Sequence, residues 1–281
     1  MRFAAQTGMN RRMDQVHEHN RRAWDERVAA RAAYIDTATE KDFQKPLAVA
    51  DPFGWLGGDV AGKRVLCLAA GGGRHGVLFA AAGALVTVVD LSPQMLALDR
   101  QVAAERGLAV QVVAASMDDL SALGEASFDI VVQPVSTCYV PDIAAVYRQV
   151  AWVTAPGGFY LSHHKQPVNL QADFGASARA RGYRLLEPYY RNGPLPPVPA
   201  GCWHREPGTM EFLHRWEALL GELCRSGFVI EDAAEPLHAD PQAEPGSFGH
   251  RSCFVPPYIG LKARRTNKTI CLKPPPKIWM P

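Results

Sequence analysis

The sequence predicts an α/β fold, in which a doubly wound, Rossmann-like and mostly parallel sheet carries helices on both faces and ends with an antiparallel C-terminal strand. Two observations support this prediction. Short apolar segments of strand length alternate five times with helix-length segments between residues 64 and 162. The first apolar segment leads directly into three glycines at residues 71–73. Because strands joined through helices run parallel with right-handed crossovers, this alternation specifies a parallel sheet.

An amphipathic helix is expected before the first strand. Apolar side chains recur there at helical spacing, at Trp24, Val28, Ala32 and Ile35. The pattern predicts a helix over residues 20–35 with Asn20 as its N-cap. Glycines and a proline at 51–58 then interrupt the chain. We therefore expect residues 1–58 to form an N-terminal helical extension and residues 59–265 to form the Rossmann-like domain.

The first two predicted strands enclose a short helix. Residues 64–70 form an apolar run typical of a strand that is buried on both faces. Residues 74–82 predict a helix that ends at Gly83, and residues 85–90 predict the second strand. This unit is the first βαβ turn of the sheet.

The next helix has recognisable ends. Ser92 is suited to the N-cap position, Pro93 to the first turn and Gly107 to the stop. Residues 109–115 predict the third strand.

Two more strands complete the alternation. Residues 128–133 predict the fourth strand, after which Pro141 opens a helix. The turn at 155–158 ends this helix, and residues 159–162 predict the fifth strand.

The C-terminal third changes in character. Residues 188–208 contain six prolines among aromatic residues, an irregular segment that is expected to form a lid. A helix is predicted over 209–226, and apolar runs at 228–230 and 258–263 are expected to close the sheet. Residues 266–281 are expected to form a basic, solvated tail.

Composition excludes several classes of protein. The longest apolar runs fall well short of the roughly 20 residues that span a bilayer, so membrane insertion is not expected. The first thirty residues are rich in charge and contain no apolar block, which argues against a secretion signal. The six cysteines form no CxxC pair and no zinc-site spacing, so we expect reduced thiols, a cytoplasmic location and no metal.

The charge distribution argues against nucleic acid as a partner. The formal net charge is +2, but the last twenty residues hold six lysines and arginines and no acid, which leaves the rest of the chain at −4. Nucleic-acid binders usually present a basic face that neutralises several phosphates. The oligomeric state cannot be predicted from the sequence.

The glycine-rich turn at residues 71–76 carries the strongest functional signal. It follows a predicted strand and precedes a helix, so its glycines allow the backbone to approach a ligand closely. Asp90 ends the second strand, nineteen positions after Gly71, where a carboxylate can bind a ribose diol. Gly71, Gly73 and Gly76 also satisfy GxGxxG, so a dinucleotide must be considered as the ligand.

Residues 64–162 resemble the class I S-adenosylmethionine-dependent methyltransferases of the small-molecule type. The resemblance implies that Gly71 and Gly73 lie against the methionine part of the cofactor, with a backbone carbonyl near Ala69 for its ammonium group. It further implies that Asp90 holds the ribose hydroxyls and that Leu91 lines the adenine slot.

Later motifs favour this cofactor over a dinucleotide. Met117 would flank the adenine ring and Asp118 would accept a hydrogen bond from its amino group. Residues 128–133, which end in Gln133, resemble the fourth motif of the family, and Gln133 is therefore counted with the cofactor-binding residues. The turn at 154–158 also resembles a family motif, and the dinucleotide fingerprint has no counterpart to these segments.

Two positions depart from the family pattern, because the family commonly has an acid in place of Cys67 and a glycine in place of Ala69. Two alternatives therefore stay open beside a methyltransferase. One is an NAD(P)-dependent oxidoreductase, and the other is a protein that binds S-adenosylmethionine without turnover.

The acceptor is expected at the carboxyl ends of strands four and five. His163 and His164 are candidates for a general base, although either histidine can equally cap the strand end by hydrogen bonding. Tyr139, Trp203 and His204 are candidates for a wall around the acceptor. A shared metal is not expected, because neighbouring strand residues point to opposite faces. The predicted reaction moves a methyl group to an O, N or C atom of a small molecule.

Overall fold

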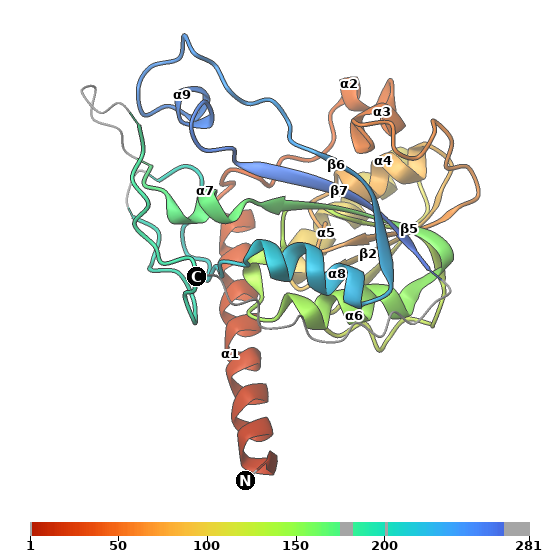
Figure 1. Cartoon of the computed structure of the whole chain (residues 1–281). Helices are drawn as coiled ribbons and strands as arrows, with labels where there is room; N and C mark the ends of the chain where they lie inside the picture. Colours follow the sequence, from red (N-terminus) through yellow and green to blue (C-terminus); the bar gives the residue numbers. More distant parts are fainter. Residues whose placement is uncertain (1, 175–181, 200–201, 267–281) are drawn as a thin grey trace.

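The computed structural model describes residues 2–174, 182–199 and 202–266. Over these residues, seven strands form one sheet in the order β3-β2-β1-β4-β5-β7-β6 (Figure 1). The strands are β1 Arg64–Leu68, β2 Leu85–Asp90, β3 Val110–Ala114, β4 Phe128–Gln133, β5 Thr154–Lys165, β6 Phe228–Ala234 and β7 Tyr258–Arg265. Strands β1 to β5 pair in parallel, and β7 runs antiparallel to both β5 and β6. The predicted fold class is confirmed.

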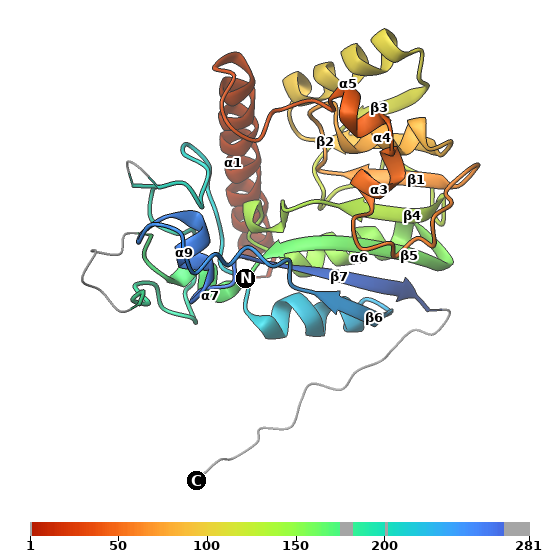
Figure 2. The ribbon, with the colours of Figure 1, turned by 90° about the horizontal axis from the view of Figure 1, so that it is seen from above.

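Helices cover both faces of the sheet (Figure 2). One face carries α3 Pro46–Ala50, α4 His75–Ala81 and α5 Pro93–Arg106, and the other carries α6 Ile143–Val153 and α8 Glu222–Arg225. Strand β1 lies between the two cores, because Leu66 and Leu68 face α6 while Val65 and Cys67 face α4. All four of these side chains are fully buried, as the apolar run predicts.

Strand order reverses at β1, which pairs with β2 on one side and with β4 on the other. The chain leaves β2 toward α5, where Ser92 Oγ accepts a hydrogen bond from Met95 N–H and Gly107 ends the helix at a φ of +63°. The predicted bounds of β2, α5 and β4 agree with the structure. The reversal leaves a crevice at the carboxyl ends of β1 and β4.

The N-terminal helix differs from its prediction. Helix α1 spans Arg2–Ala29, so it begins well before residue 20 and ends before residue 35. Asn20 is not a cap but lies in the middle of the helix, buried against the body of the protein. Figure 1 shows the first half of α1 extending away from the sheet. Apolar spacing located only residues 20–29 of the helix and overran its C-terminal end.

The C-terminal third also contains differences. Residues 209–215 are not helical, and the predicted helix is limited to a π-helical turn at Glu217–Gly221 followed by α8. Four short α-helices were not predicted, namely α2 Glu40–Phe43, α3, α7 Pro167–Gln171 and α9 Phe248–Ser252. Within the described parts of 188–208 there is neither helix nor strand.

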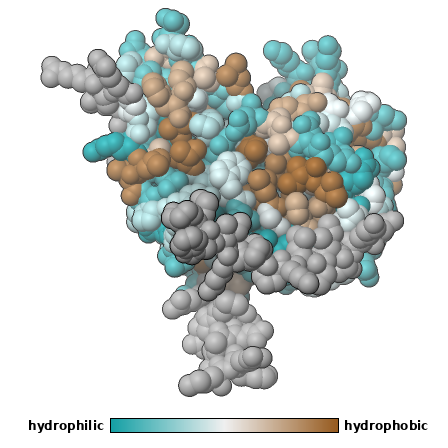
Figure 3. Space-filling view, in the orientation of Figure 1, coloured by the Kyte–Doolittle hydropathy of each residue, from teal (hydrophilic) through white to brown (hydrophobic). Residues whose placement is uncertain are grey.

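Figure 3 shows hydrophobic patches separated by hydrophilic residues on the face that carries β6 and β7.

The expected domain boundaries stay predictions, and the tail beyond residue 266 lies outside the described residues. In the part of the chain that the structure describes, no helix combines the length and the apolarity that crossing a bilayer requires.

Candidate functional site

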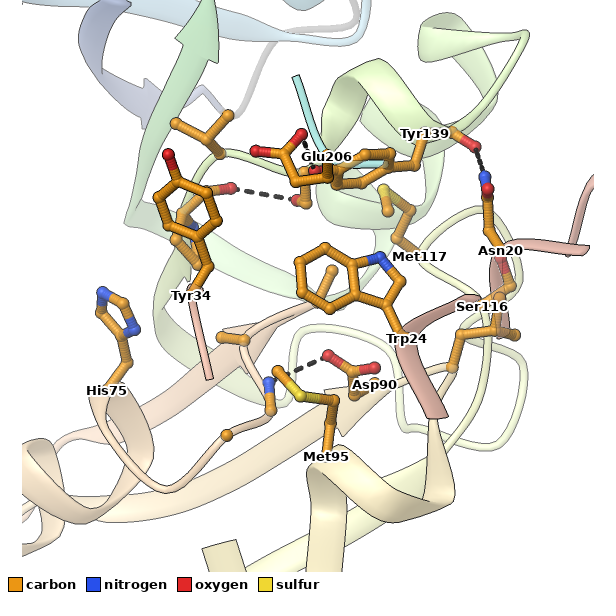
Figure 4. A pocket seen from close by; sticks show the side chains of 18 of the residues that line it. Asn20, Trp24, Tyr34, His75, Asp90, Met95, Ser116, Met117, Tyr139 and Glu206 are labelled. Atoms are coloured by element: carbon orange, nitrogen blue, oxygen red, sulfur yellow. Dashed lines mark hydrogen bonds between the residues drawn. The ribbon is translucent and has the colours of Figure 1, made fainter. Parts of the chain in front are cut away.

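A cavity of about 490 Å³ lies at the carboxyl ends of β1, β2 and β4 (Figure 4). The glycine turn, the end of β2 and the turns after β3 and β4 form its floor, while α1 and the segment around Glu206 contribute the opposite walls. Ligand pockets in proteins usually measure about 300 to 1,000 Å³. Both the size and the position at the reversal of strand order suit a cofactor site.

The backbone fixes Asp90 in the wall of this cavity. Asp90 Oδ2 accepts a hydrogen bond from Gly71 N–H at 2.9 Å, and Oδ1 accepts one from Ser92 N–H at 2.9 Å. A carboxylate offers about four lone-pair positions, so both oxygens can accept further hydrogen bonds from a ligand. Burial raises the pKa of Asp90, and backbone N–H groups, including those of Ser92 and Gly71, act against this rise.

The close approach of the glycine turn to Asp90 requires glycine at position 71. A Cβ on Gly71 would lie 2.8 Å from Met95 Cβ and 3.0 Å from Asp90 Cγ. Gly73 has a φ of +69°, and its carbonyl accepts a hydrogen bond from Ala38 N–H at 2.9 Å. Of these two glycines, Gly71 lines the cavity, whereas Gly73 contributes to the shape of the turn and does not line it.

Ala69 lines the cavity in a backbone conformation that favours glycine, with a φ of +47°. We expect Ala69→Gly to raise the free energy of unfolding by about 0.5 to 1 kcal/mol, because a side chain in this region is strained. Urea unfolding measures the change. The control is Ala70→Gly, since Ala70 is buried without a positive φ and its replacement should lower stability. Equal losses in both variants would contradict the expectation.

Asp99 supplies a buried carboxylate to the same turn. It extends from α5 with no exposed surface, and its Oδ2 accepts a hydrogen bond from Gly72 N–H at 2.9 Å. Burial raises the pKa of Asp99 to about 7, against the effect of the Gly72 and Gly73 N–H groups. Its position was detectable in the sequence, because it follows Met95 by four residues and so falls on the apolar face of α5.

The predicted adenine side of the cavity contains Leu91 and Met117, which both line the wall. Asp118 does not line it. Its Oδ1 accepts a hydrogen bond from Ser116 Oγ at 2.5 Å, and its Oδ2 lies 3.1 Å from His17 Nε2 of α1. The hydrogen bond to Asp118 raises the pKa of His17, and this contact joins α1 to the turn after β3.

Gln133 is buried beneath the cavity rather than in its wall. Its Oε1 accepts a hydrogen bond from Tyr160 OH at 2.6 Å, and its Nε2 donates to Ser136 Oγ at 2.9 Å. Ser136 lines the cavity, so Gln133 orients a wall residue. The contact of Asp118 and Gln133 with a cofactor stays a prediction.

Neither His163 nor His164 lines the cavity. His163 stacks on Phe53, with ring centroids 5.9 Å apart. His164 is fully buried, and its ring nitrogens lie 2.8 Å from Thr137 Oγ1 and 2.8 Å from Ser162 Oγ. Burial lowers the pKa of His164 to about 3. The hydrogen bonds of His164 are those of the capping alternative, whereas His163 makes a ring contact instead. A catalytic role for either histidine stays a prediction that their positions outside the cavity do not support.

One of the three predicted acceptor residues reaches the cavity. Tyr139 lines it, whereas Trp203 and His204 do not. Trp203 packs edge-on against Phe248 at 5.4 Å, and His204 Nδ1 lies 3.3 Å from Cys202 Sγ. Several residues that line the cavity were not predicted as site residues: Asn20, Tyr34, His75, Glu206 and Tyr258. Of these, His75 has its pKa lowered by burial to about 4, so its imidazole is neutral at neutral pH.

Helix α1 closes one side of the cavity with Trp24, which meets Tyr139 edge-on at 5.6 Å. One turn earlier, Asn20 Nδ2 donates to the carbonyl of Tyr139 at 2.9 Å, and Asn20 Oδ1 accepts from Met210 N–H at 2.7 Å. The same side chain thus joins α1 to the turn after β4 and to the C-terminal region. This explains why a polar residue is buried in the middle of the helix.

A buried ionic cluster lies behind the wall. Lys165 Nζ donates to Glu206 Oε2 at 2.5 Å and to Glu211 Oε1 at 2.6 Å, and Arg205 pairs with the other oxygen of Glu211. Tyr139 OH also donates to Glu206 Oε2, at 2.7 Å. Burial alone would raise the pKa of Glu206, but the charge and hydrogen bond of Lys165 outweigh it and lower that pKa. Burial raises the pKa of Glu211.

Comparison with known proteins agrees with this geometry. A family described as methyltransferase domain matches residues 65–158. The Bacillus subtilis (strain 168) protein named uncharacterized methyltransferase YbaJ is 36% identical over 231 residues, which cover 78% of this chain and 89% of that protein. The ubiquinone biosynthesis O-methyltransferase of Bordetella pertussis is 35% identical over 135 residues, covering 46% of this chain and 56% of that enzyme.

Solved structures share the fold. An S-adenosylmethionine-dependent methyltransferase from Mesorhizobium loti superposes with a TM-score of 0.62 at 26% identity, covering 77% of this chain and 98% of the other. Magnesium protoporphyrin IX methyltransferase from Synechocystis, solved with bound cofactor, superposes with a TM-score of 0.54 at 16% identity, covering 89% and 97%. Among the residues that the structure describes, no group of three or more His, Cys, Asp or Glu side chains is placed to hold a metal ion.

Proposed function

The chain belongs to the class I S-adenosylmethionine-dependent methyltransferases, and on that premise we propose that its cavity binds the cofactor through the glycine turn and Asp90. The enzyme uses S-adenosylmethionine as its cofactor and transfers a methyl group from it to a small molecule. When bound, the cofactor supplies an electrophilic methyl group on a positively charged sulfur.

The residues that line the cavity fit this cofactor. A Cβ on Gly71 would collide with Met95 and Asp90, so glycine lets the turn lie directly against the Asp90 carboxylate in the wall of the cavity. Asp90 offers oriented carboxylate oxygens for the ribose, and Leu91 and Met117 offer apolar surface for the adenine. Helix α1 lies across the cavity with Trp24 and helps to exclude water.

The fixed carboxylate of Asp90 is the observation that carries the proposal. We expect Asp90→Ala to lower the affinity for S-adenosylmethionine by about 1.5 to 3 kcal/mol, or about 10- to 150-fold, the range for hydrogen bonds to a charged group. The control is Asp59→Ala. Asp59 also accepts a hydrogen bond from the N–H two residues on, at 2.8 Å from Ala61, but it lies outside the cavity. Unchanged affinity in a folded Asp90→Ala protein would refute the ribose assignment.

Calorimetric titration with S-adenosylmethionine, S-adenosylhomocysteine and the nicotinamide dinucleotides tests the cofactor directly. Binding of the first two alone is the expected result. Binding of a dinucleotide alone would support the oxidoreductase alternative, and cofactor binding without release of S-adenosylhomocysteine for any acceptor would support a non-catalytic protein. The cytoplasmic location and the absence of a nucleic-acid partner stay predictions.

A further inference from the structure

The end of the cavity that lies away from Asp90 has its own chemistry. Glu206 and Tyr139 lie at one end in Figure 4, Asp90 and Met95 at the other, and Trp24 lies between them. Tyr34 and Tyr258 also line the cavity. A single carboxylate among aromatic rings is the kind of surface that binds a flat molecule and orients it through one polar group.

Glu206 has an oxygen free to bind such a group. Both Lys165 and Tyr139 donate to Oε2. Among the described residues, Oε1 receives no hydrogen bond, although the side chain lines the cavity. A carboxylate oxygen accepts hydrogen bonds and cannot donate when ionised, so the group that it binds must be a donor.

The charges of the cluster balance. Lys165 and Arg205 contribute two positive charges, and Glu206 and Glu211 contribute two negative charges. Two further acids line the cavity, namely Asp90 at its other end and Asp36, which is exposed to solvent. Among the described lining residues the single arginine is Arg74, and its guanidinium pairs with Asp42 at 2.9 Å. The buried cluster at the Glu206 end therefore has no net charge with which to favour a charged acceptor, and water screens the charge of the exposed Asp36. Selection of the acceptor then depends on hydrogen bonding and aromatic contact, which favour a neutral molecule.

We propose that the methyl acceptor is a neutral aromatic molecule with a hydroxyl group, which donates its hydrogen bond to Glu206 and transfers its proton there during methylation. This inference rests on the proposed function of the cavity. Tyr139 is a positioning residue, because its hydroxyl fixes the carboxylate of Glu206 and its ring meets Trp24. Lys165, which lies outside the cavity, donates a hydrogen bond to the same carboxylate.

The step balances without a further reactant. A lone pair of the hydroxyl oxygen forms the bond to the methyl carbon, while the bond from carbon to sulfur breaks and its electron pair stays on sulfur. The hydroxyl proton passes to Glu206 and then to water. Because the oxygen becomes much more acidic as its bond to carbon forms, a carboxylate whose pKa is lowered by Lys165 is a sufficient base and releases the proton afterwards.

The test measures binding of three probes to the enzyme saturated with S-adenosylhomocysteine. Catechol, benzylamine and benzoate each carry one aromatic ring and are neutral, positive and negative at pH 7. We expect catechol to bind most tightly and Glu206→Gln to weaken it at least tenfold. Tyr139→Phe should have a smaller effect. The control is Glu187→Gln, because Glu187 directly precedes the proline-rich segment and pairs with Arg191 at 2.7 Å but does not line the cavity.

The outcomes separate this inference from the cofactor assignment. Affinity for S-adenosylhomocysteine and the thermal midpoint are measured on each variant, and Glu206→Gln should retain cofactor binding. Tighter binding of benzylamine or benzoate than of catechol would overturn the inference. So would equal catechol affinity in Glu206→Gln, or no catechol binding by an enzyme that still binds the cofactor. Should Glu206→Gln fail to fold, Tyr139→Phe decides: unchanged catechol affinity and an unchanged pH profile of methyl transfer would also overturn it.

Discussion

Replacement of Lys165 by methionine is expected to lower the free energy of unfolding by about 3 to 5 kcal/mol, the usual cost of breaking a buried ion pair from one side. Lys165 is only 4% exposed, and it donates to both Glu206 and Glu211. Methionine has a similar shape but no charge, so the variant leaves two buried carboxylates with Arg205 as their nearest cation. Denaturant unfolding at pH 7 measures the loss.

The control and the pH dependence make this prediction specific. Lys262→Met removes an ion pair with Glu231, 3.7 Å long and nearer the surface, and should cost no more than about 1 kcal/mol. In the wild type, the lowered pKa of Glu206 contributes stability that is present above its unfolded pKa and is lost as the pH falls. The deficit of Lys165→Met should therefore shrink on acidification, when Glu206 can be protonated. If Lys165→Met lowered the free energy of unfolding by less than about 1 kcal/mol at pH 7, the ion pairs of Lys165 would not stabilise the cluster.

The parts of the fold that the sequence predicts correctly are those with local signals. The bounds of α5 follow from a serine cap, a proline in the first turn and a stop at Gly107, all within sixteen residues. Helix α1 has no such signals at its ends. Its position depends instead on contacts with distant segments, such as that of Asn20 with Met210. The segment 209–215 was predicted as part of a helix, yet Phe212 N–H donates to the carbonyl of Cys138. Tertiary hydrogen bonds outweigh helix propensity there.

The same distinction applies to the site. The residues predicted to bind the cofactor that line the cavity are Ala69, Gly71, Asp90, Leu91 and Met117. They follow one another within fifty residues, at the ends of consecutive strands, so motif spacing locates them. The acceptor end combines Tyr34, Tyr139, Glu206 and Tyr258. These four positions follow no helical or strand periodicity, so no sequence pattern groups them. The prediction of Trp203 and His204 came close, because the residue of that segment that does line the cavity is Glu206, two positions further on.

The buried carboxyl group of Asp99 is expected to make the free energy of unfolding strongly dependent on pH. Its pKa is raised from the ordinary 3.8 to about 7 because the side chain is buried. Between these values the folded state binds one more proton than the unfolded state, so stability falls as the pH rises through this range. At about 1.4 kcal/mol per pH unit, the wild type should lose about 3 kcal/mol relative to Asp99→Asn between pH 5 and pH 8.

Asp99→Asn keeps an oxygen that can accept the hydrogen bond from Gly72 N–H and removes only the titration, so the difference between the two proteins isolates Asp99. Asp59→Asn, at an exposed turn, should follow the wild type at every pH. A difference that does not change with pH would mean that Asp99 stays ionised in the folded state. The N–H groups of Gly72 and Gly73 would then outweigh its burial. The glycine turn would in that case bind two carboxylates through neighbouring residues, Asp90 through Gly71 and Asp99 through Gly72.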